Sequence, residues 1–267
     1  MTHLKSTALL TLLCCHTGTA LAAETPDNRE GMYLGVLAGV GTLDSTNLRQ
    51  TGTVRLPHPL PPLPVDADGD TNSPHAALGG LQLGYQWPGR RSATSGWGLQ
   101  SAIEFEGLYL DKHDLEGDMP IQPGFLGTQY VTADLDGYVL LANIVLTLET
   151  PWSQRFLPYA GLGAGTARIS LTDADSANPS EPGINHFNSD PDDSDTATAW
   201  QFKLGITGEL TRRLALFAEY RYLNIDATRY TFGATVYPGQ HPPTDAWNAR
   251  LGELEYSLFV AGLRYRF

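Results

Sequence analysis

Apolar and polar residues alternate with a period of two along most of the chain after residue 30. In residues 31–41, for example, Leu34, Val36 and Val40 share one face, while Gly35 and Gly39 lie on the other. A period of two is typical of β-strands, whereas a helix repeats every 3.6 residues. The alternation predicts eight strands and an all-β fold. Their approximate ranges are 31–41, 77–87, 97–110, 129–148, 156–171, 200–210, 213–223 and a last strand that ends at Phe267.

The connections between these strands alternate in length. The short ones are residues 88–96, 149–155 and 211–213, and the long ones are residues 42–75, 111–130, 172–198 and 224–252. Long and short connections at opposite ends are typical of outer-membrane barrels. We therefore predict an eight-stranded antiparallel transmembrane β-barrel with four long extracellular loops. Ten strands also fit, since eight spans of about ten residues use only part of the chain.

One predicted strand, residues 129–148, carries a conflict in its alternation. Val131 and Leu135 place the apolar face at odd positions, whereas Tyr138 and Leu140 place it at even positions. A β-bulge inserts one residue and so exchanges the two faces. We expect a bulge near Gly137.

The alternation alone does not say whether the apolar face points into a soluble core or out into lipid. The aromatic residues favour lipid, because they cluster near strand ends on the apolar face, as the interfacial girdles of membrane barrels do. We predict the following membrane-interface aromatics: Tyr85, Trp87, Trp97, Tyr220, Tyr222, Tyr265 and Phe267.

The N-terminus reads as a secretory signal peptide, residues 1–22. Lys5 supplies the positive charge, residues 8–15 form a short apolar run, and Ala20-Leu21-Ala22 fits a cleavage site. The two cysteines, Cys14 and Cys15, both lie inside this segment. The mature barrel domain, residues 23–267, is then expected to hold itself together without disulfides.

The 267 residues carry a formal net charge of −12, from 17 Lys and Arg against 29 Asp and Glu. An acidic chain is repelled by phosphate, so nucleic acid is excluded as the expected partner. The acidic residues concentrate in the predicted long loops, and Arg90, Arg91, Arg155, Arg212 and Arg213 lie in the predicted short turns. We therefore expect a basic periplasmic rim and an acidic outer face.

Four segments resemble the small outer-membrane β-barrel superfamily, which includes opacity-protein, OmpA-transmembrane and OmpW-like barrels. The segments are residues 32–36 (MYLGV), 158–163 (PYAGLG), 217–222 (FAEYRY) and 262–267 (GLRYRF). The resemblance implies a Gram-negative outer-membrane location. It also implies that the terminal aromatic, Phe267, is read by the barrel-assembly machinery.

Charged residues fall on the face that would line the lumen. The acidic ones are Glu104, Glu106, Glu209 and Glu219, and the basic ones are Arg168, Lys203, Arg221, Arg264 and Arg266. An eight-stranded barrel is only wide enough for side chains to fill it, and buried charges must pair. The set predicts a salt-bridged plug, with a narrow solute path as the alternative.

Catalytic and metal-binding signals are weak. Five histidines fall in the predicted long loops: His58, His75, His113, His186 and His241. His186 near Ser189 and Asp190 is no better than a chance pairing. No resident cofactor is expected, but Asp190, Asp192, Asp193 and Asp195 form a candidate site for loosely bound Ca²⁺ or Mg²⁺. Such ions could also bridge loop carboxylates to lipopolysaccharide phosphates.

These observations lead to a functional expectation. We predict a monomeric structural or surface-interaction protein, of the adhesin or surface-antigen kind, which acts through long acidic loops. Its expected partners are outer-membrane lipid, lipopolysaccharide and a host surface ligand. The alternatives are a narrow porin-like channel for small solutes and, with less support, a lipid A-modifying enzyme.

Overall fold

The computed structural model describes residues 29–267; the predicted signal peptide lies outside them. The regular secondary structure of these residues is antiparallel strand throughout, apart from one 3₁₀ turn, η1 (Gly124–Leu126). No helix among the described residues is long and apolar enough to cross a membrane. The strands are β1 (Gly31–Leu43), β2 (Asn47–Val54), β3 (Leu63–Thr71), β4 (His75–Gln86), β5 (Arg90–Arg91), β6 (Gly98–Gln122), β7 (Thr128–Glu149), β8 (Phe156–Ala177), β9 (Asp193–Glu209), β10 (Leu214–Ile225), β11 (Thr228–Phe232), β12 (Trp247–Leu251) and β13 (Leu254–Arg266).

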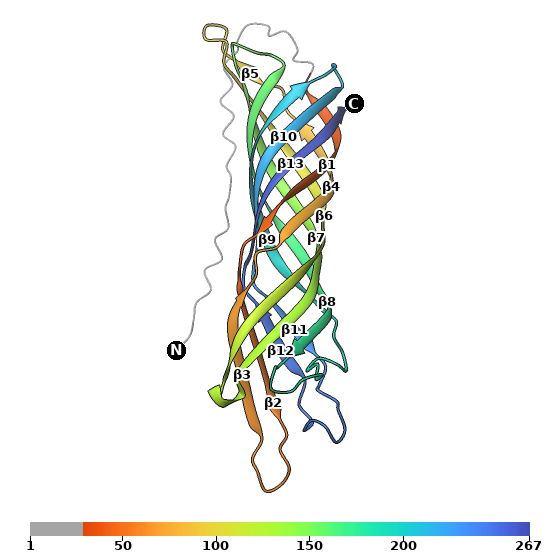
Figure 1. Cartoon of the computed structure of the whole chain (residues 1–267). Helices are drawn as coiled ribbons and strands as arrows, with labels where there is room; N and C mark the ends of the chain where they lie inside the picture. The colour runs from red at the N-terminus through yellow and green to blue at the C-terminus, as the bar shows by residue number, and fades with distance from the viewer. Residues whose placement is uncertain (1–28) are drawn as a thin grey trace, which may run out of the picture.

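Eight of these strands close into a barrel, which confirms the predicted fold class and strand count. The ring runs β1-β4-β6-β7-β8-β9-β10-β13 and returns to β1 through a ladder from Tyr33↔Arg266 to Leu43↔Tyr256. The short connections lie at the top of Figure 1 and the long ones at the bottom. Closure leaves no open edge, as the absence of water in a bilayer requires.

The barrel does not stop at the membrane. Strands β6 to β9 continue toward the long-loop end, and four further strands, which the alternation did not predict, continue the rest of the wall (Figure 1). Each follows or precedes a membrane strand after a short break: β1 leads to β2, β3 to β4, β10 to β11 and β12 to β13. The pairing order β11-β12-β2-β3-β6 continues the wall of β13, β1 and β4 toward the long-loop end. We call this second part the extracellular storey.

The extracellular storey closes between β9 and β11 through side chains. The backbone N–H groups of Arg229 and Thr231, on β11, donate hydrogen bonds to the carboxylates of Asp195 (2.8 Å) and Asp193 (2.6 Å), on β9. The two carboxylates therefore satisfy strand donors that no neighbouring strand reaches at this seam.

In the membrane half, the apolar side chains face outward. Along β7, exposed Tyr138, Leu140, Ile144, Leu146 and Leu148 alternate with buried positions. The stretch from residue 138 to residue 148 covers ten steps of about 3.3 Å. At a strand tilt of about 40°, it spans ~25 Å, which is the height of the apolar band of an outer-membrane barrel.

In the extracellular storey, the apolar face points inward instead. Val131, Ala133 and Leu135 of β7 are buried, while Thr132 and Asp134 face solvent. The buried apolar side chains of this storey include Leu48, Ala67, Leu115, Met119, Ile121, Ile169, Leu171, Phe187, Tyr230, Phe232 and Trp247. This part is packed like a soluble protein, because water surrounds it.

The predicted bulge near Gly137 is therefore wrong. Odd positions of β7 face inward along its whole length, and Gly137 pairs regularly with Leu110 and Ile169. The alternation conflict arises because the solvent outside the barrel changes from lipid to water between Tyr138 and Asp136. The register shifts lie in the neighbouring strands, between Leu110 and His113 on β6 and between Thr172 and Asp175 on β8.

This change of solvent can be tested with one substitution on each storey. Ile144→Arg places a charge on the lipid face near mid-membrane and should lower the free energy of unfolding by about 2–4 kcal/mol. Thr132→Arg, outward on the same strand in the extracellular storey, should change it by no more than about 0.5 kcal/mol. Urea unfolding in lipid vesicles measures both. Equal losses would contradict the proposed membrane boundary.

Candidate functional site

Six charged side chains meet inside the membrane half of the barrel, three acidic and three basic. Lys203 Nζ pairs with Glu104 and lies 2.8 Å from Glu106 Oε1. Arg221 Nη2 lies 3.1 Å from Glu106 and 2.5 Å from Glu219. We call this set the lumen ion cluster: Glu104, Glu106, Lys203, Glu219, Arg221 and Arg264.

The carboxylates of the cluster also accept hydrogen bonds from neighbouring neutral side chains. Tyr33 Oη donates to Glu104 at 2.5 Å, and Tyr159 Oη donates to Glu219 at 2.6 Å. Gln201 Nε2 donates to Glu106 at 2.6 Å. Arg264 pairs with Glu104 at 2.9 Å, and its guanidinium lies 4.5 Å from the centre of the Tyr33 ring. Buried charges are tolerated when they are paired and hydrogen-bonded in this way.

The strands bring the cluster together because its members are inward positions of β6, β9, β10 and β13 at similar heights. Lys203 and Arg221 are direct cross-strand partners. A glycine makes room nearby: a Cβ on Gly84 would lie 2.3 Å from Cζ of Tyr33. The tyrosine that anchors Glu104 therefore occupies space that only glycine leaves free.

Above the cluster, the interior remains filled. Leu135, Ile169, Leu223, Tyr256 and Leu258 are fully buried, as are Glu104, Lys203 and Arg221 in the cluster itself. A polar layer in the membrane is thus followed by an apolar core outside it. Six of the nine predicted lumen charges therefore meet in one layer, and the salt-bridged plug stays a prediction that conductance measurements test.

Two further members of the predicted charge set lie at the periplasmic mouth. Glu209 is approached by Arg266 at 3.4 Å and by Arg29 at 3.1 Å. Arg29 also lies 3.2 Å from Glu149. The alternation did not indicate Arg29, because it precedes the first strand.

Arg168 is not part of the lumen network. It is exposed on the outer face of β8 and donates to Ser194 Oγ at 2.9 Å. The prediction was wrong because an inward Arg168 requires the alternate positions to face lipid, whereas these positions point inward: Leu157, Tyr159, Ala167, Ile169 and Leu171. Tyr159 serves the ion cluster, and the last three pack in the core.

The predicted interface aromatics lie at two levels of the wall. Near the periplasmic end, Tyr85 packs on Trp87 (ring centroids 5.6 Å apart) and Tyr265 on Phe267 (5.5 Å). Trp97 packs there on Trp152 at 5.0 Å. Toward the extracellular side, the pairs are Tyr220 with Phe259, Trp200 with Tyr222, and Tyr109 with Tyr138.

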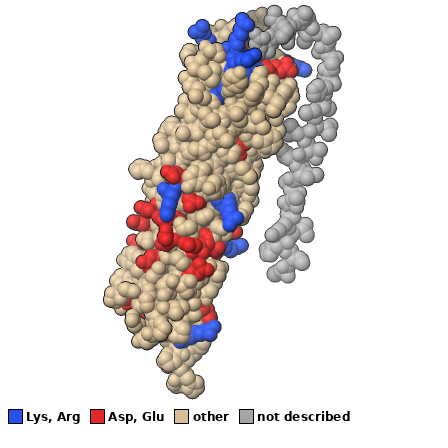
Figure 2. Space-filling model, turned by 90° about the vertical axis from the view of Figure 1, so that its right-hand side faces the viewer, with Lys and Arg blue, Asp and Glu red and all other residues tan. Residues whose placement is uncertain are grey.

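Just outside the outer aromatic level, the wall of β6, β7 and β8 is strongly acidic. Its members, which we call the acidic collar, are Asp111, Asp114, Glu116, Asp118, Asp134, Asp136, Asp173 and Asp175. In Figure 2, acidic side chains gather on one side of an uncharged band, and basic side chains lie at the end of the molecule on the other side of that band. Asp114 and Asp134 are direct cross-strand partners, a repulsive pairing. Lys112 pairs with Asp134 and lies 3.6 Å from Asp173, and the hydrogen bond from Lys112 to Asp134 raises the pKa of that lysine.

The candidate cation residues Asp190, Asp192, Asp193 and Asp195 do not converge. Asp192 accepts the backbone N–H of Asp173, while Asp193 and Asp195 accept the β11 amides of the seam. Among the described residues, the structure brings a different trio of potential ligands together: Glu181, His186 and His241.

The histidines are also distributed differently from the prediction. His75 begins β4 and His113 lies inside β6, so two of the five are on strands rather than in loops. Ser189 Oγ donates to the carbonyl of Ala234, away from His186. The weak catalytic pairing of His186 with Ser189 and Asp190 therefore finds no geometric support.

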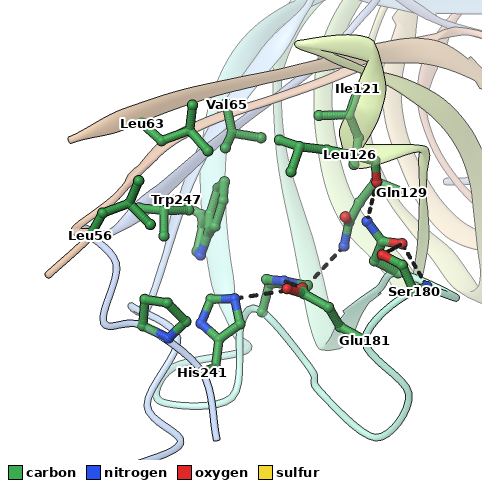
Figure 3. Close-up of a pocket in the computed structure, with 14 residues that line it drawn as sticks. Leu56, Leu63, Val65, Ile121, Leu126, Gln129, Ser180, Glu181, His241 and Trp247 are labelled. Carbon is green, nitrogen blue, oxygen red and sulfur yellow. Dashed lines mark hydrogen bonds and ion pairs between the residues drawn. The ribbon is translucent and has the colours of Figure 1, made fainter. Parts of the chain in front are cut away.

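The trio borders a cavity of about 150 Å³ near the tip of the extracellular storey (Figure 3). One wall is apolar and includes Leu56, Val65, Ile121 and Trp247. The other carries Gln129, Glu181, His186 and His241. Sequence reasoning missed this grouping because Glu181 and His186 lie in the β8–β9 loop and His241 in the β11–β12 loop, which only the folded chain brings together.

A closed barrel with an outward apolar band, two aromatic levels and a polar interior defines an outer-membrane β-barrel protein. The chain belongs to the outer membrane protein beta-barrel domain family, whose model matches residues 7–267. Its location is the outer membrane of a Gram-negative cell. No curated protein sequence matches the chain.

Solved structures of similar proteins are distant. OprG from Pseudomonas aeruginosa is 14% identical, with a TM-score of 0.47, over 89% of this chain and 98% of OprG. Neisserial surface protein A is 16% identical, with a TM-score of 0.36, over 91% of this chain and 100% of that protein. Ail of Yersinia pestis, solved with a heparin analogue, is 10% identical, with a TM-score of 0.29, over 88% and 99%.

The lumen ion cluster predicts a large cost for removing one charge. Lys203→Met leaves Glu104 and Glu106 undercompensated and should lower the free energy of unfolding by about 3–5 kcal/mol. Adding Glu104→Gln restores the charge balance and should recover part of that loss. Lys112→Met, on the exposed collar, is the control and should change stability far less, because water screens an exposed ion pair. Urea titration in detergent measures all three; a Lys203→Met variant as stable as the control would contradict the role of the cluster.

Proposed function

We propose that this protein is a surface-interaction protein: its membrane half anchors it, and its extracellular storey is the part that contacts other molecules. The observation that carries the proposal is the solid interior. Charges that pair in the lumen and an apolar core above them fill the barrel. A filled interior leaves no wide path for solutes and gives the extracellular storey a rigid base.

The acidic collar gives this platform a first partner, lipopolysaccharide. The collar begins next to the outer aromatic level and continues along the outward faces of β6, β7 and β8, which is the side of the wall that lipopolysaccharide phosphates would approach. Carboxylates and phosphates repel one another, so contact requires divalent cations such as Mg²⁺ or Ca²⁺ between them. Oxygen ligands of both groups suit these ions. The storey and its loops then extend beyond the collar toward a host surface.

Two charge removals on the collar test this partner. Asp114→Asn with Asp136→Asn should weaken Mg²⁺-dependent binding of the purified protein to lipopolysaccharide by about tenfold, which is about 1.4 kcal/mol. Asp190→Asn with Asp245→Asn, which removes the same charge farther from the membrane, is the matched control. Binding is measured by titration in detergent with and without chelator. The proposal would be refuted if lipopolysaccharide affinity changed neither on removal of Mg²⁺ nor in the collar variant.

The plugged interior predicts a second result. The protein in a planar lipid bilayer should show no stable, reproducible conductance steps, because fully buried side chains occupy the lumen. Regular steps would favour the alternative of a narrow channel for small solutes. A matched recording with the Lys203→Met variant shows whether the cluster itself is the barrier.

The lipid A-modifying alternative receives no support from the geometry. His186 lies against the Glu181 carboxylate, the Ser176 carbonyl and the Trp247 ring, and Ser189 donates its hydroxyl to the carbonyl of Ala234 instead.

A further inference from the structure

We propose that Glu181, His186 and His241 form a binding site for a divalent transition-metal ion of the zinc class, at the tip of the extracellular storey. The three side chains come from two loops that join different pairs of strands. Their potential ligand atoms all lie within 4.8 Å of one another. One carboxylate and two imidazoles are a common protein donor set for zinc.

The spacing of the ligand atoms suits a tetrahedral ion. Glu181 Oε2 lies 3.1 Å from Nε2 of His186 and 3.5 Å from Nε2 of His241. Ligands at about 2.0–2.1 Å from a tetrahedral zinc ion are separated from one another by about 3.3 Å. The two rings stand nearly perpendicular, with centroids 5.3 Å apart, and Figure 3 shows His241 turned toward the Glu181 carboxylate.

The other ring nitrogen of His186, Nδ1, already has a hydrogen-bond partner. Its Nδ1 lies 2.7 Å from the backbone carbonyl of Ser176, to which it donates. Gln129 Nε2 donates to Ser176 Oγ at 2.7 Å and lies 3.0 Å from the same His186 Nδ1. A ligating histidine typically donates its other N–H to a carbonyl, which leaves the remaining nitrogen with a lone pair. In the tautomer that donates from Nδ1, Nε2 presents its lone pair toward Glu181 Oε2 at 3.1 Å, where a cation would join the two.

His241 is buried beside the same oxygen. Its Nδ1 has no hydrogen-bond partner among the described residues. The residues that line the adjoining cavity include no lysine or arginine. A metal ion would therefore supply the positive charge that the carboxylate lacks from the cavity wall.

The loops that carry the ligands are already joined to each other. Asn188 and Val236 exchange two hydrogen bonds of 2.9 Å, and Thr235 Oγ1 donates to the carbonyl of His186 at 3.0 Å. The ring of His186 also packs against Trp247. Ligands held by such contacts lose little freedom when a metal binds.

The site is reachable from outside the cell. The Glu181 side chain is 40% exposed, whereas His186 and His241 are nearly buried. With three protein ligands, a fourth position remains for water or a small ligand in the adjoining apolar cavity. Imidazole ligands favour zinc, copper, nickel or cobalt over calcium and magnesium.

The test uses untagged protein purified from outer membranes in detergent, with Zn²⁺ and Co²⁺ as probes. Calorimetry should show one Zn²⁺ bound per chain, without competition from excess Mg²⁺, and Co²⁺ should give the visible absorption of a tetrahedral site. His241→Gln and Glu181→Gln should each weaken Zn²⁺ binding at least tenfold. His58→Gln, an exposed histidine of another loop, is the matched control and should bind as the native protein does.

Two results would overturn the site. The first is native protein that takes up no Zn²⁺ or Co²⁺, which would leave a hydrogen-bonded trio only. The second is unchanged binding in His241→Gln and Glu181→Gln. Heat-dependent mobility in gel electrophoresis checks that each variant is folded. If a variant does not fold, the Co²⁺ spectrum of the native protein decides, since a spectrum without tetrahedral bands excludes the geometry.

Discussion

The absence of water in the bilayer is the constraint on which the rest of this structure depends. Every backbone N–H and C=O within the membrane must pair inside the protein, so the strands close into a ring. A ring of eight strands leaves an interior that side chains fill. Charges that point into this interior must then balance, and the lumen ion cluster does so with three carboxylates and three cations.

The same wall serves two solvents. Below the outer aromatic level, apolar side chains face lipid and polar ones face the interior; above it, the two faces exchange their character. β7 passes through this boundary without a bulge, so the exchange lies in the choice of residues and not in the backbone. The neighbouring strands break or shift register close to the same level, where four additional strands continue the wall.

The two halves explain how an acidic chain can be an ordered membrane protein. Its negative charges do not lie in the band that faces lipid but gather on the extracellular side, with arginines at the periplasmic rim (Figure 2). Asp66 shows how such charges are used: a bidentate hydrogen bond from Arg49 lowers the pKa of this carboxyl and ties β2 to β3. Carboxylates likewise close the seam between β9 and β11.

The sequence alone was enough for the eight membrane strands, the alternation of loop lengths and most of the lumen charges. Local alternation carries this information, because neighbouring side chains on a strand must face opposite solvents. It failed where it assumed one solvent for the whole length of a strand. The alternation places Arg168 inside and predicts a bulge at Gly137, because it does not distinguish apolar residues that face lipid from those that face the core outside the membrane. Only the tertiary structure shows the extracellular storey and the trio of Glu181, His186 and His241, since both depend on loops that meet through long-range pairing and leave no period in the sequence.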